Sequence, residues 1–297
     1  MSDLFIGIDL GGTRIKAVAA NAAGEEVGQA IASTDDEAGV GIWSERIAGL
    51  VSQLQGQHGN SHAIGLCAPG LASRDARSIA FMPGRLQGLE HFDWSNFLGQ
   101  RAHVLNDAHA ALLGEVWAGA AAGERDALML TLGTGVGGAV MTDGHLLRGA
   151  IGRAGHLGHI TTDFQGAPDI VQTPGSLEAA IGDYSVPARS EGRFQSTYEL
   201  VAAHGSGDAF ASQIWLQSVR ALAAGLVSLI NAFDPALILL GGGVTKAGDA
   251  LFQPLHAFLD EMEWRPGGHR VRLAPAQLGE RAGALGAAKY AIDNQTQ

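Results

Sequence analysis

One stretch decides how the rest of the chain is interpreted, Phe5-Ile6-Gly7-Ile8-Asp9-Leu10-Gly11-Gly12-Thr13-Arg14-Ile15-Lys16-Ala17-Val18-Ala19. An apolar run ends at an aspartate, breaks at two glycines and a threonine, and then resumes. This order predicts a strand, a tight turn and a second strand. The glycines are expected to take the positive φ angles that such a turn demands.

The turn also suits a phosphate group. Glycines at 11 and 12 leave backbone N–H groups bare, so that a phosphate oxygen can approach them, and Thr13 adds a hydroxyl donor. Asp9 ends the strand and can hold Mg²⁺ directly or through water. An ordinary hairpin with a glycine-rich turn is the alternative, because short glycine motifs give many false positives.

A second copy of this pattern begins at residue 127. The apolar run 127–132 leads into Gly133-Thr134-Gly135-Val136-Gly137-Gly138, which we predict as the second turn, and then into another apolar run. Repetition of such a unit constrains a fold more than either copy alone. The chain is therefore predicted to form two related α/β domains around a cleft that holds a nucleotide.

Composition limits the class of protein. The 297 residues are 46% hydrophobic and 16% charged, which is typical of a globular protein with room for two domains. Nineteen basic and thirty acidic residues give a formal charge of −11, which argues against nucleic acid or an anionic membrane as partner. A single cysteine, Cys67, fits a reducing compartment. We recognise no export signal or membrane span, and expect a cytoplasmic protein.

Hydrophobic periodicity predicts the remaining elements. Further strands are expected at 26–32, 63–68, 102–105, 236–240 and 271–274, and helices at 39–55, 94–98, 108–116, 210–233, 248–262 and 283–292. Ser176 is expected to cap a helix that begins near residue 177. The last helix is expected to pack back on the first domain. We therefore place the first domain at 1–115 plus 283–297 and the second at 116–282.

Three polar or glycine-rich segments have more than one interpretation. Asp107, at a strand-to-helix junction, can cap the helix or face the ligand crevice at the carboxyl end of the strand. His156 and His159 can be a metal pair, a sugar-binding pair or a chance arrangement in a loop. The run 241–243 can be a tight turn or a surface against which a purine or ribose lies.

Taken together, these motifs resemble the ROK family (repressors, open reading frames, kinases) over nearly the whole chain. The matching segments are Asp9 to Thr13, Asn106-Asp107-Ala108, Gly133 to Gly138, Gly155-His156-Leu157-Gly158-His159, Gly175-Ser176-Leu177-Glu178 and Asp234 to Gly243. The resemblance implies the actin-like fold shared by sugar kinases and heat-shock-70 ATPases.

The resemblance also implies a function, the transfer of the γ-phosphoryl group of ATP to a hexose, most often at the 6-hydroxyl of glucose. Asp107 would be the general base, ionised at neutral pH without any tuning of its pKa. Sugar contacts are expected from Asn106, Asp107, His156, His159 and Glu178. The implied nucleotide site, with Mg²⁺ near Asp9, comprises Asp9, Gly11, Gly12, Thr13, Lys16, Gly133, Thr134, Gly135, Gly241, Gly242 and Gly243. ATP or polyphosphate as donor stays open, and a homodimer is expected.

The sequence departs from the family pattern in two places. Most relatives have a cysteine cluster that binds structural zinc with the histidine matching His159, whereas the stretch 163–175 has no cysteine. We expect no structural zinc here and a loop held by packing instead. Near the sugar, His156 replaces the usual glutamate and Pro83-Gly84-Arg85-Leu86 replaces Pro-Asn-Leu. N-acetylmannosamine kinases of the family can also have His at the position of His156, which keeps an N-acetylhexosamine as an alternative substrate.

Other classes of function remain to be weighed. A repressor of this family would carry a DNA-binding segment before the first motif, but only four residues precede Phe5. A sugar sensor without kinase activity is disfavoured by the intact Asp9 and Asp107. An actin-like or chaperone ATPase would lack the set His156, His159 and Glu178.

Overall fold

The computed structural model describes residues 3–294. The chain folds into two compact units, a first unit of 1–124, 146–154 and 276–297 and a second unit of 125–145 and 155–275. These limits differ from the predicted ones. Helix α3 (Asp107–Ala118) stays whole within the first unit, and the segment 146–154 returns to that unit after the chain has entered the second.

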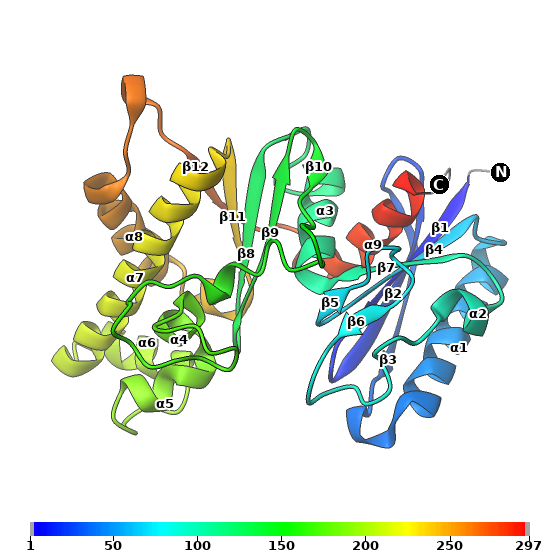
Figure 1. Cartoon of the computed structure of the whole chain (residues 1–297), viewed down its shortest axis with the longest axis horizontal. Helices are drawn as coiled ribbons and strands as arrows, with labels where there is room; N and C mark the ends of the chain where they lie inside the picture. The colour runs from blue at the N-terminus through cyan, green and yellow to red at the C-terminus, as the bar shows by residue number, and fades with distance from the viewer. Residues whose placement is uncertain (1–2, 295–297) are drawn as a thin grey trace. The chain divides into compact units, whose positions relative to one another are not determined.

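The first unit is built on a five-stranded mixed sheet (Figure 1). Its order is β3 (Glu26–Ser33), β2 (Arg14–Asn21), β1 (Leu4–Leu10), β4 (Ala63–Ala68) and β7 (Ala102–Asn106). The hairpin strands β1, β2 and β3 are antiparallel, whereas β1, β4 and β7 run parallel. The short strands β5 (Leu71–Ala72) and β6 (Ile79–Phe81) form a separate pair.

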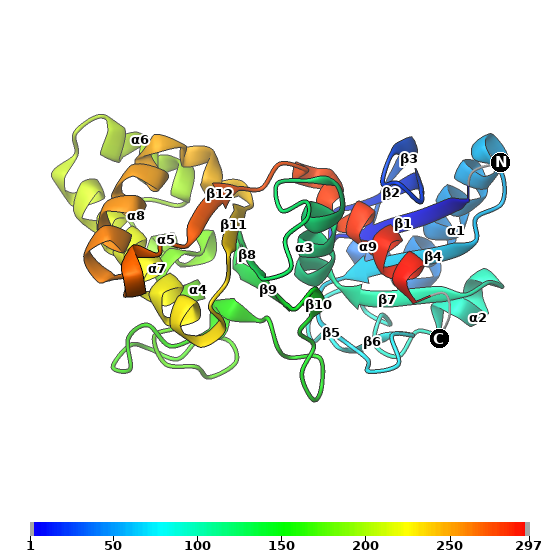
Figure 2. The same ribbon diagram turned by 90° about the horizontal axis from the view of Figure 1, so that it is seen from above.

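Two helices cover opposite faces of this sheet. Successive side chains of β1 point to opposite faces, so alternate residues of this strand pack against different helices. Ile6 and Ile8 join the core with Trp43 of α1 (Val40–His58), near η1 (Asp36–Ala38) and α2 (Trp94–Leu98). Phe5, on the other face, joins a cluster with Ala288 of α9 (Ala282–Asp293). The last helix therefore packs on the first unit as predicted, beside β1, β4 and α3 (Figure 2).

Glycines let α9 approach the sheet and α3 at backbone distance. A Cβ built on Gly7 would lie 1.8 Å from the Ala284 carbonyl oxygen, and one on Gly65 would lie 1.7 Å from the Ala287 carbonyl oxygen. On the helix itself, a Cβ at Gly286 would lie 1.7 Å from the Ala110 carbonyl oxygen of α3. No side chain fits at any of these contacts without displacing main chain.

The second unit repeats the sheet of the first. Its order is β10 (His145–Leu146), β9 (Val136–Thr142), β8 (Ala127–Leu132), β11 (Leu237–Gly241) and β12 (Arg272–Pro275). The pair β8–β9 is antiparallel, and β8, β11 and β12 are parallel, as in the first sheet. The internal repeat inferred from the two Gly/Thr turns is therefore present in the sheet topology.

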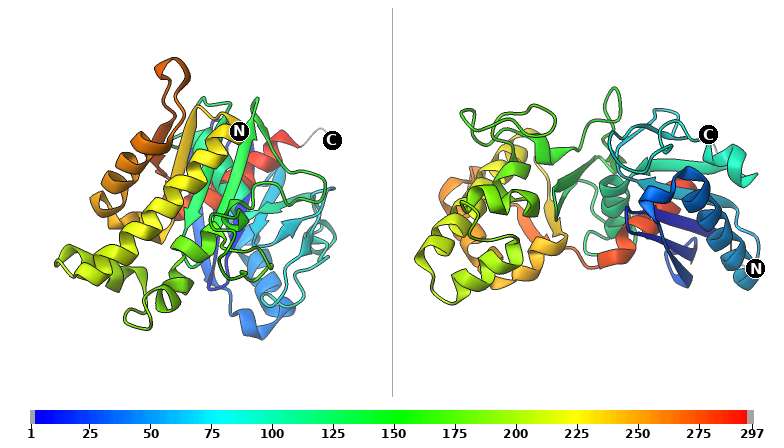
Figure 3. Two further views of the ribbon diagram at one scale, coloured as in Figure 1. Left: turned by 60° about the vertical axis from the view of Figure 1, so that its left-hand side comes forward. Right: turned by 90° about the horizontal axis from the view of Figure 1, so that it is seen from below.

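Helices cover the second sheet, and the longest of them is α7 (Ala209–Phe233) (Figure 3). It packs against α4 (Leu177–Ile181), α6 (Thr197–Gly205) and α8 (Asp249–Met262), with η3 (Asp183–Ser185), α5 (Val186–Arg189) and η4 (Gly243–Ala247) nearby in the chain. Within residues 3–294, α7 alone is long and apolar enough to cross a membrane. Its buried stripe packs on neighbouring helices, so we interpret it as a core helix.

Candidate active site

The turn between β1 and β2 has the predicted position but a different backbone. The Gly11 N–H donates to the Arg14 carbonyl at 3.1 Å and closes the turn, while the amides of Gly12 and Thr13 donate no hydrogen bond within residues 3–294. Neither Gly11 nor Gly12 has a positive φ, so that expectation was wrong. A Cβ on Gly12 would lie 1.7 Å from an Arg85 guanidinium nitrogen, so a side chain at 12 would displace the end of Arg85.

Arg85 lies in the segment that replaces the family's usual Pro-Asn-Leu, and no role of its own was predicted for it from the sequence. Its guanidinium lies against Gly12, and its Nε is 3.7 Å from a carboxylate oxygen of Asp36. The same Asp36 accepts a hydrogen bond from the Leu86 N–H at 2.6 Å and so fixes the loop. A cation therefore stands beside the bare amides of the phosphate turn. In the sequence, the indication of this cation was the arginine that follows Gly84.

Asn106, rather than Asp107, caps helix α3. The Asn106 side-chain oxygen accepts from the N–H groups of Ala108 and His109, and its amide donates to the Gly70 carbonyl at 3.0 Å. This corrects the interpretation of Asp107 as the cap. The Asn106 side chain also hydrogen-bonds to the carboxylate of Asp107. Asp107 occupies the first turn of the helix and also accepts from the Ala108 N–H, at 2.8 Å.

Asp9 and Asp107 influence each other inside the first unit. Burial, and then the charge of Asp107, raise the pKa of Asp9 to about 6, against the opposing effects of Lys16 and of the hydrogen bond from Cys67. Burial also raises the pKa of Asp107, against the lowering effect of its hydrogen bonds. The Lys16 Nζ lies 4.0 Å from Oδ2 of Asp9 and 3.5 Å from Oε2 of Glu280.

This carboxylate arrangement fits one magnesium ion. Asp9 would be better stabilised as an anion by a nearby cation, since burial and a second carboxylate penalise its charge. Among the described residues no three His, Cys, Asp or Glu side chains gather as a metal cage. Mg²⁺ commonly binds through one or two carboxylates and completes its shell with water and substrate phosphates. Asp9 is therefore a suitable protein ligand for such an ion.

The turn between β8 and β9 is shorter than predicted. Leu132 pairs with Val136, so the turn comprises residues 133–135, and Gly137 and Gly138 belong to strand β9. The Gly133 N–H donates to the Gly135 carbonyl at 2.9 Å. The N–H groups of residues 183 and 184 hold the carbonyls of residues 133 and 134, so the chain after α4 fixes this turn.

Glu178 and His159 lie next to this second turn. Glu178 accepts a hydrogen bond from the Val136 N–H at 2.8 Å, and a Cβ on Gly135 would lie 2.3 Å from its carboxylate. Ser176 caps α4 as predicted. The helical turn η2 (Leu157–His159) packs on β9, and the Leu177 N–H donates to the Ile160 carbonyl, which ties α4 to η2.

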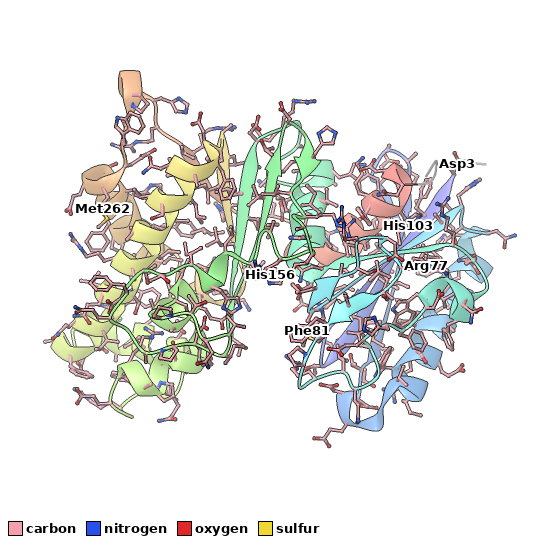
Figure 4. The ribbon with its side chains drawn as sticks, in the orientation of Figure 1. Asp3, Arg77, Phe81, His103, His156 and Met262 are labelled. Atoms are coloured by element: carbon pink, nitrogen blue, oxygen red, sulfur yellow. The ribbon has the colours of Figure 1, made fainter. Side chains whose placement is uncertain are left out.

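His156 immediately precedes η2, on the loop that follows β10 (Figure 4). Burial, and then the neighbouring His159, lower the pKa of His156. A neutral imidazole carries one donor and one acceptor, unlike the acceptor-only glutamate that the resemblance leads one to expect. In the second unit, Glu178 contacts the turn 133–135, and the loop that carries His156 and His159 packs on β9.

The loop 163–175 is held by backbone hydrogen bonds and by hydrogen bonds to one buried aspartate. The expectation that packing holds it was wrong, since Phe164 and Ile170 are 80% and 79% exposed. Instead Asp169 accepts from the His159 ring at 2.8 Å and from the N–H groups of Val171 and Thr173, each at 2.9 Å. Nothing in the sequence pattern singled out this aspartate.

In the glycine run 241–243, the backbone conformation explains the glycine at 242. Gly242 has a φ of 91°, and a Cβ on it would lie 2.3 Å from the Leu132 carbonyl oxygen, so the turn interpretation explains this residue. Gly243 begins η4 and has open space where a Cβ would be. Of these two glycines, Gly243 is the one whose missing side chain leaves room for a ligand.

The predicted residues thus form two half-sites. The first half-site, in the first unit, comprises the turn 11–13 with Asp9, Lys16, Asn106 and Asp107, and Arg85 joins it. The second half-site, in the second unit, comprises the turn 133–135 with His156, His159, Glu178 and residues 241–243. That both half-sites serve one pair of substrates stays a prediction.

Comparisons with known proteins agree with this geometry. The model of the ROK family matches residues 5–294. A glucokinase from Halalkalibacterium halodurans is 33% identical, with 96% of this chain and 94% of the relative covered. The crystal structure of a ROK hexokinase from Thermus thermophilus is 32% identical and has a TM-score of 0.89, with 99% of each chain covered.

A ROK family glucokinase from Streptomyces griseus, solved with glucose and AMPPNP, is 26% identical with a TM-score of 0.78. The alignment covers 98% of this chain and all of that one, 100%. The predicted fold class, that of the actin-like sugar kinases, is confirmed by these neighbours. Because the family model matches nearly the whole length and the relatives reach this identity, the chain belongs to the ROK family.

Proposed function

We propose that this protein is an ATP-dependent hexose kinase that phosphorylates the 6-hydroxyl of glucose or of a related aldohexose. The observation that carries the proposal is the first half-site, where Asp9 near the end of β1 and Asp107 directly after β7 lie at the same edge of the parallel strands β1, β4 and β7. Glucokinases and a hexokinase among the relatives, one of them solved with glucose and an ATP analogue, support the same reaction.

The chemistry follows from the residues of the first half-site. The sugar hydroxyl oxygen forms a bond to the γ-phosphorus while the bond from that phosphorus to the bridging oxygen breaks and ADP leaves. Asp107 accepts the hydroxyl proton, and its raised pKa makes it a better proton acceptor than an exposed aspartate. The bare amides of Gly12 and Thr13 receive phosphate oxygens. Mg²⁺ bound at Asp9 would neutralise phosphate charge.

The second half-site is proposed to hold the sugar, together with Asn106. Glu178 and His159 are each fixed by a hydrogen bond to their own unit, as a site that discriminates between hydroxyl groups requires. His156 in place of glutamate favours one second candidate, an N-acetylhexosamine, because its ring can donate to an amide oxygen as well as accept. Residues 133–135 and Gly243 are proposed to border the nucleotide.

A coupled assay for ADP release tests the function. Purified protein with MgATP is offered aldohexoses and N-acetylhexosamines one at a time, with polyphosphate as an alternative donor. We expect turnover that depends on a hexose. Turnover without sugar would indicate an ATPase, and binding of a sugar without turnover would indicate a sensor. The same preparation tests the proposed homodimer, by mass in solution. Cytoplasmic residence and the lack of a nucleic-acid partner remain proposals too.

Arg85 is proposed to stabilise the charge of the phosphoryl group in transfer, since its guanidinium stands over the turn that receives the phosphates. Replacing it with alanine should lower kcat by about 10–100-fold with little change in the KM for the sugar. Arg77 is the matched control, because it is equally exposed, at 57%, in the same unit but pairs with Asp93 instead. An R85A variant with an unchanged kcat and a raised KM for the sugar would contradict this role.

A further inference from the structure

Asp169 lies at the centre of a small hydrogen-bond network that reaches His159. Its side chain is 0% exposed, whereas that of His159 is 25% exposed. One carboxylate oxygen, Oδ1, accepts from the N–H groups of Val171 and Thr173. The other, Oδ2, contacts His159 Nδ1 at 2.8 Å. Oδ1 therefore binds the loop backbone, and Oδ2 binds the imidazole.

The network continues to the helix that carries Glu178. Ser176 caps α4 through its hydroxyl oxygen, and its side chain also hydrogen-bonds to Asp169. The Thr162 N–H donates to the Gly175 carbonyl at 2.8 Å, which closes the base of the loop. Asp169 thus links η2, the loop 163–175 and the start of α4 within the second unit.

The carboxylate decides which nitrogen of His159 carries a proton. Burial by itself would raise the pKa of Asp169, but the hydrogen bonds from His159, the backbone and Ser176 outweigh it and lower the pKa. An ionised carboxylate only accepts hydrogen bonds, so His159 Nδ1 must be the donor. In a neutral imidazole the other nitrogen, Nε2, is then an acceptor.

We infer that Asp169 is a positioning residue that holds His159 as an acceptor for a hydroxyl hydrogen of the sugar. This inference rests on the proposed function, in which His159 contacts the hexose. Its consequence is a specificity rule. At the position that His159 contacts, the sugar must present a hydrogen-bond donor, and a group that only accepts should be rejected as strongly as a missing group.

The variant Asp169→Asn should turn His159 Nε2 from an acceptor into a donor while the hydrogen bonds from the loop backbone are kept. Its side-chain oxygen can keep the two backbone hydrogen bonds that Oδ1 makes, while the –NH₂ group replaces Oδ2 and becomes a donor. His159 Nδ1 must then accept, and the ring proton moves to Nε2. The exchange is nearly isosteric, so a change in the sugar preference cannot be assigned to lost volume.

Nitrogen NMR of ¹⁵N-histidine-labelled, ligand-free protein at pH 8 reports directly which ring nitrogen of His159 carries a proton. The signals of His159 are identified by their loss in His159→Gln. We expect Nδ1 to be protonated and Nε2 bare in the native protein, and the reverse in D169N. Protonation of Nε2 in the native protein, or identical spectra in both, would overturn the inference. Because the measurement needs no turnover, it stands apart from the kinase assay.

Kinetics with sugar analogues give the second readout. Analogues with one hydroxyl replaced by hydrogen or by fluorine are compared with the best hexose, because fluorine cannot donate. At the position that His159 contacts, both analogues should lose about 3–10-fold in kcat/KM with the native enzyme. With D169N the fluorinated analogue should become better than the deoxy analogue by about 3-fold. An active enzyme whose ratio is the same in both proteins contradicts the inference alone.

Asp163→Asn is the control for loop damage. Asp163 lies in the same loop, and its carboxylate accepts from the Gln165 N–H at 3.0 Å without contacting a histidine. This variant should leave the His159 spectrum and the analogue ratios as in the native protein. If D163N changes them as D169N does, the effect belongs to the loop and the inference fails. A chain that phosphorylates no hexose at all would instead contradict the proposed function.

Discussion

Replacing Asp107 by asparagine is expected to slow turnover by about 10²–10⁴-fold while sugar binding is kept. The amide has nearly the shape of the carboxylate, and its oxygen can still accept from the Ala108 N–H. It cannot take a proton from the attacking hydroxyl. The measurement is kcat from ADP release at saturating sugar, with the sugar dissociation constant measured by calorimetry.

The pH dependence of the native enzyme follows from the same carboxylate. Because burial raises the pKa of Asp107, the ionised base should disappear at a higher pH than for an exposed aspartate. The rate should therefore rise with pH on the acid side, where Asp9, with a pKa of about 6, also titrates. In D107N the remaining acid limb should belong to Asp9 and lie at lower pH, because the charge of Asp107 that raises the pKa of Asp9 is gone. Asp249→Asn, also in the first turn of a helix, is the control and should keep the native rate. A near-native kcat for D107N would remove the base assignment.

Gly286→Ala is expected to have the largest effect on stability. The new Cβ would lie 1.7 Å from the Ala110 carbonyl oxygen and 2.8 Å from the Gly114 nitrogen, and both belong to the backbone of α3. Overpacking of this kind costs about 1–3 kcal/mol, and more where main chain must move. The first unit should lose about 3 kcal/mol of its free energy of unfolding, measured by urea denaturation followed by circular dichroism.

The control is the same substitution on a free helix face. Gly49 is exposed in α1, and nothing lies within 4 Å of a Cβ built on it. Gly49→Ala should stabilise the protein by about 0.5–1 kcal/mol, since alanine is the better helix former. The two variants should thus have opposite signs. A Gly286→Ala protein as stable as the native one would show that α9 does not contact α3 as described.

The fold was predictable because its signals are local or repeated. Apolar runs on both sides of a Gly/Thr turn predict a hairpin, and finding that hairpin twice predicted two similar sheets. The strand-to-helix junction at Asn106-Asp107 and the cap at Ser176 depend on neighbouring residues, so their positions followed from sequence. Even there, the interpretation of Asp107 as a possible cap was one residue late, since Asn106 caps the helix.

What the sequence left undetermined depends on contacts between distant residues. The contact between Gly12 and the Arg85 side chain joins two separate loops, and no turn pattern encodes that approach. Asp169 lies in an irregular, exposed loop without periodicity, so nothing marked it as the partner of His159. The raised pKa of Asp107 likewise comes from burial, which only the packed chain defines.

The glycine contacts of α9 have a consequence for biosynthesis. The sheet of the first unit is made of strands that are translated before the second unit, yet α9, which is translated after the second unit, covers one of its faces. Residues 125–145 and 155–275 can complete the second unit before that helix leaves the ribosome. Domains usually fold in order from the N-terminus. Here the second unit should become protease-resistant first in stalled nascent chains, and the first unit only after residue 293 has emerged.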